Sequence, residues 1–312
     1  MDLTGLDDPP LPPFAESVVE LADGRDLTFA QYGDPDGEAV VWCHGTPGAR
    51  HQIPPDAPAH AERSGIRIIV PDRPGVGGSS TDHNRTLLSW ADDVEQLLDD
   101  VGVERFAVAG LSGGGPHVLA IAHEFPDRAS AGALLGGMVP LSGPDAPPST
   151  PDIVPLAMEV AHRLRFPLGS LMSLLLRPIT PEIGEKVFPF ALKVLPENDR
   201  AILGSVGFQS MFIDDLWQGS RDRFRAQSHD VSAFGTNWGF SPRGITVPIK
   251  LWHGTEDKLV PLSHAEHLVS LIPRAEIEAF DGEGHFAGYA RSPDVLDWLM
   301  ANHLPIDDEA SV

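Results

Sequence analysis

The sequence predicts an α/β fold in which a mostly parallel sheet is flanked by helices. Short apolar runs of the length of buried strands alternate along the chain with amphipathic helical stretches. Polar, glycine-rich turns follow directly after several of these apolar runs. Because loops at the carboxyl ends of neighbouring parallel strands meet in one crevice, these turns are expected to form the functional site.

Patterns in the first 139 residues place the strands and helices in order. The expected strands are a hairpin within residues 17–32, followed by residues 38–43, 67–70, 105–109 and 129–136. Apolar residues recur at helical spacing over residues 89–101, with Ser89 as the expected N-cap. A further helix is expected over residues 113–125, where Pro116 suits the first turn because its missing N–H costs nothing there.

The pattern changes after the sixth expected strand. A linker rich in Pro and Ser spans residues 140–151, and helical stretches without strands fill residues 152–229. Runs typical of strands resume near Ile245. We therefore divide the chain into a first core part at residues 1–139, an inserted helical segment with its linkers at 140–240 and a second core part at 241–312.

Residues 110–114, Gly-Leu-Ser-Gly-Gly, match the G-x-S-x-G pattern of a nucleophile elbow. An expected strand precedes them and an expected helix follows. In such a turn the serine takes a strained backbone conformation that raises its hydroxyl clear of the sheet. Flanking glycines suit the turn because side chains would collide there. Ser112 is therefore the candidate nucleophile.

Three further polar turns also follow expected strands. They read His44-Gly45-Thr46-Pro47-Gly48, His253-Gly254-Thr255-Glu256-Asp257 and Gly282-Glu283-Gly284-His285. Serine, acid and histidine thus occur in the order Ser112, Asp257 and His285, each after an expected strand. This is the chain order of one class of Ser-His-Asp catalytic triad.

These motifs resemble those of the α/β-hydrolase fold superfamily, in its capped serine hydrolase and esterase-like branch. Residues 72–79, Asp-Arg-Pro-Gly-Val-Gly-Gly-Ser, also resemble the D-x-x-G-x-G-x-S loop that follows the fourth strand in this family. The resemblance runs from about Ser17 to His303. It implies an eight-stranded, mostly parallel sheet flanked by helices, with a helical cap inserted after the sixth strand.

The acid of the site has two competitors nearby in the sequence, Glu256 and Asp281. Residues 254–261, Gly-Thr-Glu-Asp-Lys-Leu-Val-Pro, resemble the family's G-x-x-D-x-x-V-P run. That resemblance selects Asp257.

The resemblance implies a role for each residue of the site. Ser112 would attack the substrate, and His285 would act as general base and then general acid. Asp257 would orient His285 and stabilise its charged form. The backbone N–H groups of Gly113 and of Thr46, the position used in the family's H-G-x-P motif, would bind the oxyanion.

Four other polar residues of these turns receive structural roles. His44 and His253 are expected to brace their loops by hydrogen bonds. Asp72 and Arg73 are expected to hold their loop together, and Arg73 could also reach the crevice.

The expected activity is hydrolysis of a small to medium, largely apolar carboxylic ester. Epoxide hydrolases and haloalkane dehalogenases of this fold carry aspartate at the nucleophile position, so Ser112 argues against both. Proline iminopeptidases typically read H-G-G-P-G and G-G-S-W-G where this chain has residues 44–48 and 110–114. A peptidase of that kind stays an alternative, as do a cofactor-free oxygenase or lyase and a ligand sensor of the same fold.

Substrate contacts are expected beside the nucleophile and the base and in the inserted segment. Leu111, Met138 and Phe286 are the main candidates. Further candidates are Leu171, Met172, Phe208, Met211, Phe212, Trp217 and Trp238.

The composition bears on partners. The chain has 45 Asp and Glu against 22 Lys and Arg, a net charge of −23, which disfavours nucleic acid and anionic membranes. We expect a small-molecule substrate, and leave monomer and homodimer open. Neither a metal-ligand cluster nor a nucleotide-binding fingerprint competes with the elbow, so no metal and no cofactor are expected. Short acidic pairs such as residues 92–93, 99–100 and 214–215 predict a heavily hydrated surface.

The single cysteine, Cys43, excludes an internal disulfide and is expected to be a small core residue. The chain starts with an acidic, Pro-rich stretch unlike a signal peptide, and its longest apolar stretches are too short to span a membrane. These features predict a cytoplasmic protein.

Overall fold

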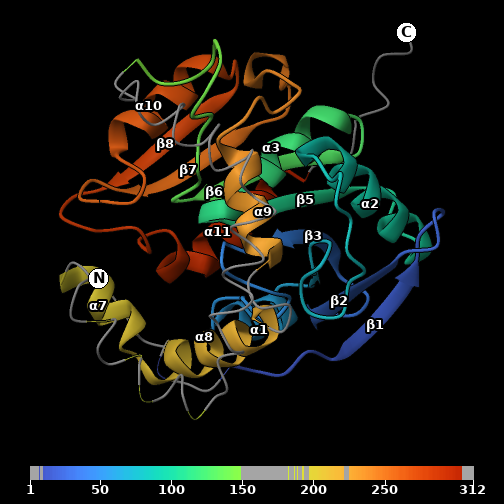
Figure 1. Cartoon of the computed structure of the whole chain (residues 1–312). Coiled ribbons are helices and arrows are strands. Elements are labelled where there is room, and N and C mark those ends of the chain that lie inside the picture. Colours follow the sequence, from blue (N-terminus) through green and yellow to red (C-terminus); the bar gives the residue numbers. More distant parts are fainter. Residues whose placement is uncertain are drawn as a thin grey trace, which may run out of the picture.

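An eight-stranded sheet forms the centre of the molecule (Figure 1). The computed structural model describes residues 10–148, 197–220 and 225–303, together with positions 7, 182, 186, 188 and 192. The strands are β1 (Ala15–Glu20), β2 (Asp26–Gly33), β3 (Glu38–Cys43), β4 (Ile66–Pro71), β5 (Phe106–Leu111), β6 (Ala129–Leu135), β7 (Ile249–Gly254) and β8 (Ala275–Phe280). Their spatial order is β1-β2-β4-β3-β5-β6-β7-β8. Strand β2 is antiparallel to both of its neighbours, and all other pairs are parallel.

Helices cover both faces of the sheet (Figure 1). They are α1 (Ala57–Arg63), α2 (Leu87–Asp100), α3 (Gly115–Glu124), α7 (Glu197–Leu203), α8 (Val206–Gly219), α9 (Arg225–Phe234), α10 (Leu262–Leu271) and α11 (Ser292–Ala301), with short 3-10 turns η1 (Ser112–Gly114), η2 (Pro242–Gly244) and η3 (Tyr289–Arg291). Because strand side chains alternate, Phe106 and Val108 of β5 pack with α2, α3 and α10, whereas Ala107 and Ala109 pack with α1 and α11. The predicted eight-stranded, mostly parallel sheet flanked by helices is confirmed.

Helices α7, α8 and α9 lie in the sequence between β6 and β7, and we call them the insertion helices. In Figure 1, α9 lies in front of the middle of the sheet, and α7 and α8 lie below the sheet in this view. Much of the linker and inserted segment expected at residues 140–240 falls outside the described residues, so those boundaries stay a prediction. Within the part of the chain that is described, no helix is both long and apolar enough to span a bilayer.

The start of α2 differs from the prediction. Thr86, not Ser89, is the N-cap, and the helix begins at Leu87. The Thr86 hydroxyl accepts from the N–H of Ser89 at 3.0 Å, and the N–H of Thr86 donates to the Ser89 hydroxyl at 2.8 Å. The hydroxyls of Thr86 and Ser89 satisfy each other's backbone N–H groups, which is why the helix begins three residues earlier than an N-cap at Ser89 would give.

One acidic pair of α2 also differs from the expected hydrated surface. Asp92 is exposed, but Asp93 is only 3% exposed. Its two oxygens accept a bidentate pair of hydrogen bonds from Arg25, at 2.6 and 2.8 Å. Pairing with a guanidinium offsets the cost of burying the carboxylate.

Replacing Thr86 by alanine is expected to lower the free energy of unfolding by about 1 kcal/mol. The variant loses the hydroxyl that accepts from the N–H of Ser89. Denaturant unfolding of Thr86→Ala measures the loss. The control Asp92→Ala, on the exposed face of the same helix, is expected to change stability by less than about 0.5 kcal/mol. Equal effects of the two variants would contradict the assigned cap.

Candidate active site

Ser112 lies at the sharp turn from β5 through η1 into α3. Its φ angle is 50°, and no other non-glycine residue among those described has a positive φ. This left-handed conformation is costly for a residue with a side chain. The turn is also crowded, since a Cβ atom on Gly110 would lie 2.8 Å from Val118 Cγ2 and one on Gly114 would lie 2.2 Å from the carbonyl oxygen of Cys43. The turn therefore has the geometry of a nucleophile elbow.

The side chains of Asp257 and His285 meet in a buried hydrogen bond of 2.7 Å between Oδ2 and Nδ1. Because a carboxylate only accepts, the proton lies on Nδ1 and Nε2 is left as the basic nitrogen. The other carboxylate oxygen accepts from the N–H groups of Leu259 and Val260 at 2.8 and 2.9 Å. Burial raises the pKa of Asp257, but the hydrogen bond and charge of His285 and the N–H of Val260 together hold this pKa below its usual value. The acid is thus ionised at neutral pH.

The two competing acids lie elsewhere. Glu256 and Asp281 are exposed, and the Asp281 carboxylate accepts from the hydroxyl of Thr255 at 3.5 Å. His253 braces the acid loop, as expected, with Nε2 2.8 Å from the carbonyl oxygen of Val260. Of the three candidate acids, Asp257 is the one that the structure brings to His285.

A turn after β6 joins the nucleophile turn to the histidine. The N–H of Met138 donates to the carbonyl oxygen of Ser112 at 3.0 Å. At Gly136, whose φ is 56°, a Cβ atom would lie 3.1 Å from Nδ1 of His285. Ser112 and His285 therefore contact the same short turn, although 173 residues separate them in the sequence.

The expected oxyanion loop lies against the nucleophile turn. A Cβ atom on Gly113 would lie 2.5 Å from Oγ1 of Thr46, so these two candidate residues are direct neighbours. The side chain of Gln52 closes the loop, accepting from the N–H of Gly45 at 2.5 Å and donating to the carbonyl oxygen of Pro47 at 3.0 Å. Gly113 also heads the turn that leads into α3, where backbone N–H groups carry partial positive charge.

Arg73 holds the oxyanion loop from within the protein. Its buried guanidinium donates to the carbonyl oxygens of His44 and Gly45 at 2.6 and 2.7 Å, to Oγ1 of Thr46 at 2.9 Å and to Asp230 at 2.9 Å. The guanidinium nitrogens all donate to these partners, so Arg73 does not reach into the crevice. His44 is a brace, as expected, with Nδ1 2.9 Å from the carbonyl oxygen of Gly45. Burial and the charge of Arg73 lower the pKa of His44, which keeps its ring neutral.

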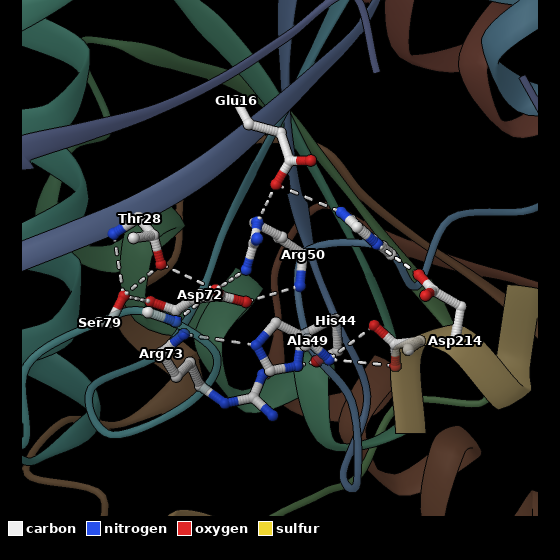
Figure 2. A network of polar contacts seen from close by, with 12 residues as sticks. Glu16, Thr28, His44, Ala49, Arg50, Asp72, Arg73, Ser79 and Asp214 are labelled. Carbon is white, nitrogen blue, oxygen red and sulfur yellow. Dashed lines mark hydrogen bonds and ion pairs between the residues drawn. The ribbon is translucent and has the colours of Figure 1, made fainter. Parts of the chain in front are cut away.

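Figure 2 shows how the loop after β4 is joined to the oxyanion loop. The fully buried Asp72 accepts from the N–H and the guanidinium of Arg50 at 2.7 and 2.8 Å, and from the hydroxyl of Thr28 at 2.8 Å. Arg50 also pairs with Glu16 of β1 at 2.6 Å. Asp72 thus ties the oxyanion loop to the sheet, which is the structural role expected for it.

Each insertion helix places one buried aspartate on a loop of the site. The carboxylates belong to Asp199 of α7, which accepts from the N–H groups of His285 and Phe286, Asp215 of α8, which accepts from the N–H of Ala49, and Asp230 of α9, which pairs with Arg73 and Arg85. All three are at most 2% exposed. The expectation of a hydrated surface is therefore wrong for Asp215, because its carboxyl group is buried and accepts a hydrogen bond from the N–H of Ala49. Sequence analysis missed all three residues, since no local spacing marks an aspartate as buried.

The main candidates for substrate contact surround the catalytic candidates. Leu111 is buried beside Ser112, whereas Met138 and Phe286 are partly exposed. The ring of Phe286 stands edge-on to the ring of His285, with centroids 5.3 Å apart. Phe208 of α8 packs edge-on against Phe286 in turn, at 5.6 Å.

The remaining candidates are spread more widely. Leu171 and Met172 lie outside the described residues. Trp238 lines a cavity of about 300 Å³ between the start of α2 and the end of α9, and none of the predicted catalytic residues lines it. In the described ranges, no group of three or more His, Cys, Asp or Glu side chains is placed to hold a metal ion.

Comparison with known proteins establishes the family. Residues 38–290 match the family described as the α/β hydrolase fold. The chain belongs to this family. It is 28% identical over 290 residues to the 2-hydroxy-6-oxo-6-phenylhexa-2,4-dienoate hydrolase of Burkholderia cepacia, covering 86% of this chain and 88% of that protein. It is 24% identical over 324 residues to a proline iminopeptidase of Xylella fastidiosa, covering 92% and 96%.

The solved structures agree on the fold. A thermophilic esterase from Thermogutta terrifontis superposes with a TM-score of 0.62 at 20% identity, covering 93% of this chain and all of that one. The sequence relatives of this α/β hydrolase thus include a dienoate hydrolase and a peptidase, and the likeness to the esterase shows the shared fold.

The contact between α8 and the oxyanion loop of this α/β hydrolase is expected to weaken as pH rises. His51 Nδ1 lies 2.5 Å from Asp214, and Nε2 lies 3.4 Å from Glu16 (Figure 2 shows Asp214 and Glu16). Burial lowers the pKa of His51, but the two carboxylates raise it above its usual 6.5. A raised folded-state pKa gives stability that is complete below the unfolded value of about 6.5 and is lost as pH rises through the folded value.

The free energy of unfolding of His51→Gln is therefore expected to fall further below that of the wild type at about pH 5.5 than at about pH 9. Urea unfolding of both proteins at the two pH values measures the difference. A deficit that is constant, or larger at the higher pH, would contradict the assigned ion pairs.

Proposed function

We propose that this protein is a serine hydrolase that cleaves a small to medium, largely apolar carboxylic ester through an acyl-enzyme on Ser112. The observation that carries the proposal is the buried hydrogen bond of 2.7 Å between Asp257 and His285, next to a serine at a strained strand-to-helix turn. An ionised acid on Nδ1 leaves Nε2 ready to take the serine proton, which is what activates a weak nucleophile.

The reaction follows from these groups. Ser112 Oγ attacks the ester carbonyl carbon while its proton passes to Nε2 of His285. The N–H groups of Gly113 and Thr46 stabilise the negative charge that develops on the carbonyl oxygen. His285 then returns the proton to the leaving alkoxide, which departs as the alcohol. Water, deprotonated by the same histidine, attacks the acyl-enzyme and releases the acid and free Ser112.

A neutral substrate is supported by the state of the nearby cations. An anionic acyl group buried in the site would need a positively charged partner. The arginines described around the site are already paired: Arg73 and Arg85 with Asp230, and Arg50 with Asp72 and Glu16. The flanking side chains Leu111, Met138 and Phe286 are apolar, which suits an uncharged acyl chain.

A second candidate is hydrolysis of an oxo-dienoate, favoured by the similarity to the Burkholderia cepacia hydrolase over most of both chains. A dienoate carries a carboxylate, so hydrolysis of such a substrate would require a positively charged side chain that faces the bound substrate. A peptidase has a similarity of the same kind, to the Xylella fastidiosa proline iminopeptidase, but residues 44–48 and 110–114 depart from the patterns typical of those enzymes. An oxygenase, a lyase and a ligand sensor remain alternatives.

Ser112→Ala and His285→Ala are each expected to lower ester turnover about a thousandfold or more, because each removes one member of a proton-transfer pair. The double variant is expected to be scarcely slower than either single variant, since the two residues act as a unit. Assays with p-nitrophenyl esters from acetate upward measure these rates, and an oxo-dienoate in the same panel tests the second candidate. Losses that multiply in the double variant would count against a shared mechanism.

Labelling with a fluorophosphonate, located by mass spectrometry, gives a test that needs no substrate. We expect an adduct on Ser112 in the wild type and none in Ser112→Ala. Absence of labelling in folded wild-type protein would contradict the proposal.

Asp257→Asn is expected to slow turnover strongly, because the amide no longer provides a charged acceptor for Nδ1–H and can hold the wrong tautomer. Glu256→Gln and Asp281→Asn are the matched controls, since each removes one carboxylate from the same region at an exposed position. Activity retained in Asp257→Asn but lost in either control would show that the acid is misassigned.

A further inference from the structure

The histidine loop has a polar partner outside the core of the fold. Asp199 lies on α7, is 2% exposed, and points its carboxylate at two successive peptide groups. Oδ2 accepts from the N–H of His285 and Oδ1 accepts from the N–H of Phe286, each at 3.1 Å. The neighbouring Asn198 donates from its side chain to the carbonyl oxygen of Gly282. Helix α7 therefore contacts both ends of residues 282–286.

The loop is shaped to admit this carboxylate. A Cβ atom on Gly284 would lie 2.3 Å from Oδ2 of Asp199 and 2.5 Å from its Oδ1. Any side chain at Gly284 would push the carboxylate away from the two N–H groups. The buried carboxylate of Asp199 therefore fits against the loop only because residue 284 is a glycine.

The contact bears on the orientation of the imidazole. Asp257 fixes the ring of His285 through Nδ1, but a ring is held in place only if its own backbone is also fixed. Asp199 supplies that second restraint by immobilising the peptide groups on either side of the His285 Cα atom. Without this acceptor the two buried N–H groups would lack a hydrogen-bond partner, which is unfavourable, so the loop would rearrange.

We propose that Asp199 is a positioning residue for His285, through which the insertion takes part in building the catalytic site. This inference rests on the proposed function, because it assumes that His285 is the base. Asp199 touches neither the substrate nor the reacting atoms, and acts only by holding the histidine loop in its reactive geometry.

The variant Asp199→Asn tests the proposal with almost no change in shape. Its amide keeps one acceptor oxygen but turns an NH2 group toward one of the two N–H donors. We expect kcat to fall about 10- to 100-fold, as for other small misplacements of a catalytic group, while KM changes by less than about threefold. The rate of fluorophosphonate labelling of Ser112 is expected to fall by a similar factor.

Glu197→Gln is the matched control. It removes one carboxylate from the same helix, two residues away, at an exposed position. It is expected to leave kcat, KM and the labelling rate unchanged. All assays are run at a temperature at which circular dichroism shows every variant folded.

Amide hydrogen exchange separates a positioning role from general destabilisation. Exchange at His285 and Phe286 is expected to accelerate in Asp199→Asn and not in Glu197→Gln, while the amides of β5 keep their protection. If Asp199→Asn cannot be obtained folded, Asn198→Ala, which loosens the same loop at Gly282, is expected to give a smaller loss of kcat with the same local increase in exchange.

The outcomes are distinct. Slower labelling and turnover together with faster local exchange support the proposal. Wild-type labelling and exchange in Asp199→Asn overturn it, and so does a rise in KM at constant kcat, which would assign Asp199 to substrate binding. A wild-type enzyme that is not labelled at Ser112 at all defeats the proposed function itself, and the inference falls with it.

Discussion

The close approach of backbone segments at the carboxyl edge of the sheet is the constraint on which the rest of this site depends. The turn at Ser112 sits against the end of β3 and against the turn after β6, and glycines stand at the points of contact. Only where Cβ atoms are missing can the strand ends that carry the candidate nucleophile, acid, base and oxyanion loop come this near to one another. The positive φ of Ser112 is the local cost of that arrangement, and it is held by the packing around it.

Buried carboxylates form the second layer of the site. A carboxylate inside a protein is tolerated only when N–H groups or cations satisfy it. Asp72, Asp199 and Asp230 meet this requirement by binding loops that carry the candidate residues. The acidity of the chain is therefore not simply a surface property, because several of its aspartates hold the functional loops in place.

Local sequence patterns predicted the strands and the polar turns that follow them, because a polar turn directly after an apolar strand is a feature of neighbouring residues. Resemblance to the family's motifs then selected Ser112, Asp257 and His285 within those turns. The family match confirms the fold, and the structure brings Asp257 to His285. The partners of the loops could not be predicted in this way. Asp199 and His285 are 86 residues apart, and the sequence around Asp199 is that of any exposed helix. The same limit misplaced the cap of α2, where both Thr86 and Ser89 are good N-cap residues and only the folded backbone shows which one precedes the helix.

The anchoring of the insertion helices constrains how a substrate could enter. If α7, α8 and α9 moved away from the core as one body, the carboxylates of Asp199, Asp215 and Asp230 would leave the N–H groups and arginines that they satisfy. Such a movement would leave polar groups without their partners and loosen the histidine loop and the oxyanion loop at the same time. A site opened by that movement would admit water and would also lose the contacts that hold the proposed base and oxyanion loop in place. Entry that leaves these three contacts intact therefore costs far less than a movement of the three insertion helices away from the core.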